Sequence, residues 1–167
     1  MVLSDEPEAP GLSIARKAGV AAEAIDFRAY RGKAAFEAAL EARLRAERAE
    51  IVCLAGFMRV LSPAFVEQWK GRMLNVHPSL LPNLRGLNTH ERALREGLAE
   101  HGCTVHFVTA ELDAGPIIAQ ARVSVLPGDD AEALAARVLR EEHRIYPAAL
   151  DAVARSLRAA DAETEGR

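Results

Sequence analysis

Short apolar runs alternate with amphipathic segments along most of the chain. Residues 51–55 form an unbroken apolar run, which predicts a short strand buried on both faces. Residues 33–50 carry large apolar side chains four positions apart, with glutamate and arginine between them, which predicts a helix with one solvated face. This alternation predicts an α/β protein: a single Rossmann-like domain with a mostly parallel twisted sheet, an antiparallel C-terminal hairpin and flanking helices.

The same patterns predict the remaining elements. The predicted strands are a short segment at 1–4, then 20–26, 72–76, 103–109 and 117–125, of which the last two form a hairpin. The other predicted helices are 12–18, 62–69, 88–97 and 131–145. Pro147 is expected to break or kink the last helix, because proline lacks an amide hydrogen. A second helical stretch then fades, so we expect one domain over residues 1–157 and a polar tail over 158–167.

Composition and charge narrow the class of protein. The 167 residues are 50% hydrophobic and carry a net charge of -3, which suits a packed core and argues against broad electrostatic binding to nucleic acid or anionic membrane. No apolar run reaches the roughly 18 residues that a membrane-spanning helix needs, and the first residues do not resemble a signal peptide. We therefore expect a cytoplasmic, soluble protein that binds neither nucleic acid nor membrane.

Several kinds of site are excluded by motif and spacing. Cys53 and Cys103 lie far apart in apolar stretches, so both are expected to be small core residues. The sequence has no GxSxG, Walker A or GxGxxG motif, which argues against a serine hydrolase, a P-loop enzyme and a dinucleotide-binding protein. Four further histidines lack metal-binding spacing, so no metal is expected: His90, His101, His106 and His143.

Asn75 and His77 end a predicted strand, where α/β proteins bind their ligands. One residue separates them, so their side chains point to the same side of an extended strand. An amide donor beside an imidazole suits an acyl carbonyl, because the pair can bind its oxygen as negative charge develops and can then move a proton. The alternative is structural, with Asn75 capping the turn and His77 packing on the prolines that follow.

Asp113 lies in a turn of sequence Asp-Ala-Gly-Pro. Aspartate is common in such turns for local backbone reasons, which is the structural interpretation. If its carboxylate instead faces His77, it stabilises the imidazolium and raises the histidine pKa, which provides an acid usable near neutral pH.

Blocks of sequence that contain these three residues resemble one enzyme family. The chain is similar, from residue 1 to about residue 150, to the phosphoribosylglycinamide formyltransferases of purine (IMP) biosynthesis and one-carbon metabolism, within the 10-formyltetrahydrofolate-dependent formyltransferases. The blocks that carry the resemblance are AGFMRVLSP (55–63), LNVHPSLLP (74–82), TVHFVT (104–109) and ELDAGPII (111–118). Two more blocks favour the phosphoribosylglycinamide formyltransferases over other 10-formyltetrahydrofolate enzymes: GLNTH (86–90) and EHRIYP (142–147).

The resemblance implies an activity and a set of site residues. The activity is transfer of a formyl group from 10-formyltetrahydrofolate to the amine of glycinamide ribonucleotide, with Asn75 and His77 on the formyl oxygen and Asp113 supporting His77. The implied folate contacts are Asn75, Asp113, Lys33, Met58, Arg59, Val60, Leu61, Thr109, Ala110, Glu111 and Leu112. The implied ribonucleotide contacts are Leu139, Arg140, Glu141 and Glu142.

The chain departs from the family at its start. The family begins with one more strand and a glycine-rich phosphate loop, so residues 1–157 are expected to be a formyltransferase domain that lacks its first βα unit, on the order of 30 residues. Three explanations are open: a fragment or misassigned start, complementation by another polypeptide, and a noncatalytic relict that binds folate. A deformylase-like hydrolase is an alternative activity, and a monomer or weak homodimer is expected.

Overall fold

The computed structural model describes the backbone of residues 1–165 and the side chains of residues 1–163. The chain divides into two compact units. The first contains Met1–Glu50 and Gly56–Gln68, and the second contains Ile51–Ala55 and the residues from Trp69 onward. Each unit has its own sheet.

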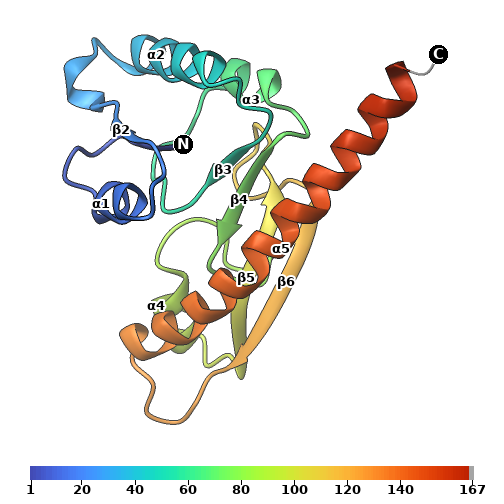
Figure 1. The fold of residues 1–167 in the computed structure, drawn as a ribbon. Helices are drawn as coiled ribbons and strands as arrows, with labels where there is room; N and C mark the ends of the chain where they lie inside the picture. Colours follow the sequence, from blue (N-terminus) through green and yellow to red (C-terminus); the bar gives the residue numbers. More distant parts are fainter. Residues whose placement is uncertain (166–167) are drawn as a thin grey trace. The chain divides into compact units, whose positions relative to one another are not determined.

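The first unit is a small parallel βαβ arrangement followed by helices. Strands β1 (Val2–Ser4) and β2 (Ala22–Ala24) pair in parallel, and helix α1 (Pro10–Lys17) packs on both of them (Figure 1). A short 3-10 helix, η1 (Phe27–Ala29), leads to α2 (Lys33–Ala46), and α3 (Pro63–Gln68) completes the unit. Ser62 caps the start of α3, because its Oγ accepts a hydrogen bond from Phe65 N at 3.2 Å.

The second unit is a four-stranded sheet with a long helix against it. The strand order is β3 (Val52–Leu54), β4 (Met73–His77), β5 (Glu100–Phe107) and β6 (Ile117–Ser124), of which only β3 and β4 pair in parallel. Helix α4 (Thr89–Arg95) lies between β4 and β5 in the chain, and α5 (Ala131–Glu165, orange to red) lies along β5 and β6 (Figure 1). The predicted α/β fold with parallel strands and a C-terminal hairpin is confirmed.

A continuous apolar core lies between α5 and the sheet of the second unit. Its most buried members come from β4, α4, β5 and α5, and include Leu74, Cys103, Val105, Leu134 and Val138. Gly102 lies inside β5, where a Cβ would stand 2.0 Å from the carbonyl oxygen of Ala121 on β6. Close approach of the two strands therefore requires glycine at this position.

Two local expectations were wrong. The apolar strand β3 is not buried on both faces, and Cys53 is exposed, because β3 pairs only with β4 in the described part of the chain. Pro147 does not interrupt α5, which continues to Glu165 and so includes most of the expected polar tail. Ile145, Ala149 and Val153 are buried in the core around the proline, and this packing offsets the hydrogen bond that the proline removes.

Candidate active site

Asn75 and His77 project from the same side of β4, as their spacing predicts. The antiparallel register places Asn75 opposite His106 of β5 and His77 opposite Thr104. Directly opposed side chains share one face of the sheet, so these four polar side chains gather on one face.

The proline-containing loop after His77 is held by one buried hydroxyl. Thr104 Oγ1 donates to the carbonyl oxygen of Ser79 at 2.6 Å and accepts from Leu81 N at 3.0 Å. Gln120 Nε2 of β6 donates both to Thr104 Oγ1 at 2.8 Å and to the carbonyl oxygen of Leu81 at 2.9 Å. Sequence reasoning missed Thr104 and Gln120, since only the strand register brings them to this loop.

Asp113 reaches the same place from the loop between β5 and β6. Its backbone has a φ of +50°, in the left-handed region that few residues other than glycine adopt. Two residues later, a Cβ on Gly115 would stand 1.8 Å from the carbonyl oxygen of Phe107, so glycine lets the loop pass close to β5. Asp113 Oδ2 accepts a hydrogen bond from Gly86 N at 2.9 Å, which anchors the carboxylate.

His77 and Asp113 form a buried pair. Asp113 Oδ2 lies 3.5 Å from His77 Nδ1, an ion-pair distance longer than a well-formed hydrogen bond. The other ring nitrogen, Nε2, contacts the carbonyl oxygen of Leu84 at 3.0 Å. Both ring nitrogens therefore face oxygen acceptors, and each contact is satisfied when the nitrogen carries a proton.

His106 completes this polar cluster, and sequence reasoning did not single it out as functional. Its Nε2 lies 3.3 Å from Asn75 Nδ2 and 3.8 Å from Asp113 Oδ1. Burial lowers the pKa of His106, so the ring is neutral near pH 7. His106 lies in the TVHFVT block that carries the family resemblance, which was a sequence signal for a functional residue. Its contact with Asn75, however, follows only from the pairing of β4 with β5.

Two further histidines, His90 and His101, contact each other. His101 Nε2 on β5 is 3.1 Å from His90 Nδ1 on α4, and the rings meet edge to face. Burial, together with the nearby His90 and His77, lowers the pKa of His101 to about 4. Among residues 1–165 no group of three or more histidine, cysteine or acidic side chains is arranged to hold a metal ion.

Lys33 and the segment Met58–Leu61 line one cavity of the first unit. Its volume is about 290 Å³, and Phe27, Phe36 and Glu37 complete its wall. Met58 and Val60 are 72% and 63% exposed, so the cavity presents apolar side chains to solvent. Arg59 is held in place, because its guanidinium lies 3.8 Å from the centroid of the Phe27 ring and 2.5 Å from Asp5 Oδ2.

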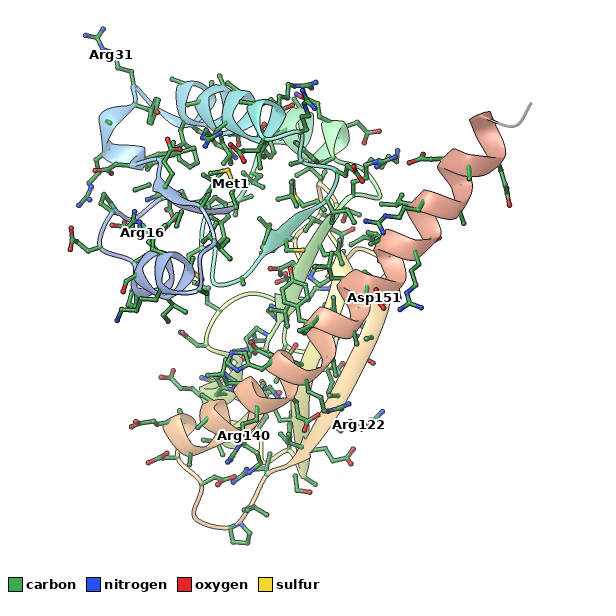
Figure 2. All side chains as sticks on the ribbon, in the orientation of Figure 1. Met1, Arg16, Arg31, Arg122, Arg140 and Asp151 are labelled. Atoms are coloured by element: carbon green, nitrogen blue, oxygen red, sulfur yellow. The ribbon has the colours of Figure 1, made fainter. Side chains whose placement is uncertain are left out.

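The other predicted contact residues lie on the surface of the second unit. Thr109, Ala110, Glu111 and Leu112 are exposed in the loop that carries Asp113, and Glu111 pairs with Arg85 at 2.7 Å. The four predicted ribonucleotide contacts follow one another on α5, where Figure 2 labels Arg140. Leu139 and Arg140 are exposed, Glu141 pairs with Arg144 of the same helix at 2.6 Å, and burial raises the pKa of Glu142.

None of the helices in the described part of the chain combines the length and apolar character needed to cross a membrane.

Comparisons with known proteins place the chain in a family. The model of the formyl transferase family matches residues 1–150. The phosphoribosylglycinamide formyltransferase of Escherichia coli (strain K12) is 49% identical over 146 residues, which are 87% of this chain and 69% of that protein. The trifunctional purine biosynthetic protein adenosine-3 of Homo sapiens is 47% identical over 92% of this chain, but this chain spans only 15% of it.

Solved structures extend the likeness to the fold. Glycinamide ribonucleotide transformylase 1 from Symbiobacterium toebii superposes with a TM-score of 0.87 and 52% identity, over 89% of this chain and 70% of that one. Phosphoribosylglycinamide formyltransferase from Brucella melitensis has a TM-score of 0.85 and 53% identity, over 89% and 77% of the two chains. The chain belongs to the formyl transferase family, and its similar relatives include phosphoribosylglycinamide formyltransferases.

Proposed function

We propose that this chain transfers a formyl group from 10-formyltetrahydrofolate to the amine of glycinamide ribonucleotide. One observation carries the proposal: Asn75, His77 and Asp113 lie in one polar cluster, with His77 and Asp113 buried and paired at 3.5 Å. The names of the similar proteins support transfer to this acceptor over the hydrolytic and noncatalytic alternatives.

The cluster suits each stage of the reaction. Attack of the ribonucleotide amine on the formyl carbon forms a carbon–nitrogen bond and places negative charge on the formyl oxygen, where the Asn75 amide and the His77 ring donate hydrogen bonds. The proton lost by the amine passes to folate N10 as the bond between N10 and the formyl carbon breaks. His77 is the proposed general acid in this transfer, and Asp113 stabilises its protonated form.

Substrate must replace one contact of His77. Its Nε2 bonds the carbonyl oxygen of Leu84 in the free protein. We propose that the formyl oxygen takes the place of this carbonyl, so that one oxygen acceptor is exchanged for another and no hydrogen bond of the ring is lost.

The remaining assignments are proposals of the same kind. We propose folate contacts at Lys33 and Met58–Leu61 in the first unit and at Asn75 and Thr109–Asp113 in the second. Lys33 is a cation suited to a carboxylate of the folate tail, and Met58 and Val60 are apolar side chains free to cover a ring. We propose contacts to the ribonucleotide at Leu139, Arg140, Glu141 and Glu142. We also propose that the protein uses no metal and acts in the cytoplasm as a monomer or weak homodimer.

The test is a formyl-transfer assay on the 167-residue chain and on a version extended upstream. The extended version is included because the chain spans 69% of the Escherichia coli relative that it matches. We expect the folded, extended protein to form formylglycinamide ribonucleotide. The proposal is wrong if that protein binds the folate or deformylates it without transferring the formyl group to the amine.

A further inference from the structure

His106 occupies a position that the proposed reaction does not yet use. Its ring is almost fully buried on β5, directly opposite Asn75. Nδ1 contacts the carbonyl oxygen of Phe107 at 2.9 Å, and Nε2 contacts Asn75 Nδ2 at 3.3 Å. Nε2 also lies 3.8 Å from Asp113 Oδ1. One ring therefore reaches two of the three proposed catalytic side chains.

These contacts select one tautomer. A carbonyl oxygen only accepts hydrogen bonds, so Nδ1 must carry the proton that it shares with Phe107. In the neutral ring Nε2 is then an unprotonated acceptor, and it pairs with the amide nitrogen of Asn75 rather than with the amide oxygen. One amide hydrogen of Asn75 is thereby fixed against His106, and the half-buried side chain keeps its second amide hydrogen for another partner.

The charge of His106 also affects Asp113. The titratable groups that face its ring are Asp113 and His77, of which the first favours a protonated ring and the second opposes it. A protonated Nε2 would turn toward Asp113 Oδ1 and share the carboxylate that pairs with His77 through Oδ2. It would also repel the amide hydrogens of Asn75, because both groups would then be donors.

We propose that His106 is a positioning residue for formyl transfer: its unprotonated Nε2 fixes the Asn75 amide with a hydrogen toward the formyl oxygen, and its neutrality reserves Asp113 for His77. This role rests on the proposed function. His106 itself touches neither substrate nor the transferred group, and it acts through Asn75 and Asp113.

Two substitutions separate this role from simple packing. His106→Leu fills the buried space with an apolar side chain but removes the acceptor, so we expect kcat to fall on the order of tenfold to a hundredfold with the KM of both substrates unchanged. His106→Gln returns an oxygen acceptor near the place of Nε2, so we expect most of kcat to return. Thermal unfolding of both variants is the control for folding. Equal losses in the two variants, or full activity of His106→Leu, would overturn the proposal.

A measurement without substrates tests the tautomer directly. Long-range 15N–1H correlation spectra distinguish protonated from unprotonated ring nitrogens, and at about pH 7 we expect a protonated Nδ1 and an unprotonated Nε2 for His106. A protonated Nε2 would overturn the proposal even if the enzyme is active. If the extended protein shows the expected tautomer but transfers no formyl group, the proposed function fails while the assigned contacts stand.

Discussion

The polar cluster at the end of β4 and the cavity of the first unit differ in how far their side chains are exposed to solvent. In the cluster, His77, His106 and Asp113 are buried and each contacts other groups of the protein. In the cavity, Met58 and Val60 are mostly exposed. The side chains of the cluster are therefore held by contacts within the protein, whereas Met58 and Val60 have most of their surface open to solvent. Substitutions in the cluster should change turnover and stability, and substitutions in the cavity wall should change binding.

The largest effect is expected at Asp113. Asp113→Asn keeps an oxygen that can accept from Gly86 N but removes the negative charge of the proposed partner of His77, so we expect kcat to fall on the order of a hundredfold or more. His77→Ala should have the same effect, and in both variants folate affinity, measured by fluorescence titration, should remain largely intact. Asp151→Asn on α5, whose carboxylate pairs with Arg155 on the surface, is the matched control. Loss of binding and folding in both variants would instead support a structural role.

A loss of stability is expected at Thr104. Thr104→Val preserves the shape of the side chain but leaves the Ser79 carbonyl oxygen and Leu81 N without their partner, so we expect unfolding free energy to fall by about 1–3 kcal/mol. Thr109→Val is the control, because Thr109 is exposed and its hydroxyl donates only to the nearby Glu111 carbonyl at 3.0 Å. Urea unfolding monitored by circular dichroism measures both. Equal changes would mean that burial of the cluster does not determine its stability.

The sequence predicts those features of the site and the fold that depend on local periodicity. The spacing of Asn75 and His77 places both side chains on one side of a strand, whatever the rest of the fold does. The N-terminal cap of α5 also depends only on neighbouring residues, because Asp130 Oδ1 accepts a hydrogen bond from Ala133 N at 2.8 Å. Asp113 is a candidate from its turn sequence as well, but such turns are usually structural, and only the family resemblance favours its role beside His77.

The features that the sequence did not predict depend on contacts between segments far apart in the chain. His106 pairs with Asn75 because of the register of β4 and β5, which no local pattern reports. Cys53 lies in an apolar run that predicts burial, but its exposure follows from the place of β3 in the sheet order. Pro147 is a local signal for a helix end, and the packing of Ile145 and Ala149 in the core overrides it.

Acid should weaken the fold through His101. Its pKa is about 4 in the folded protein, below the ordinary value of 6.5, so the unfolded chain binds a proton more readily. The stability that depends on a neutral His101 is complete above about pH 6.5 and is lost as pH falls toward about 4, by on the order of 3 kcal/mol. His101→Gln should have a flatter dependence of unfolding free energy on pH across this window. Parallel curves for the variant and the unmodified chain would contradict the expectation.

The smallest change in stability is expected in the cavity wall. Met58→Ser removes an apolar side chain that is 72% exposed, so unfolding free energy should change by less than about 0.5 kcal/mol. If folate covers this side chain, the lost burial should raise the KM for 10-formyltetrahydrofolate on the order of tenfold, equivalent to about 1.4 kcal/mol, with kcat unchanged. Ile14→Ser on α1 is the matched control, because Ile14 is 66% exposed in the same unit and has no proposed contact with substrate. An unchanged KM for Met58→Ser would separate the cavity from folate binding, and a fall in kcat instead would mean that the cavity wall acts on turnover as the polar cluster does.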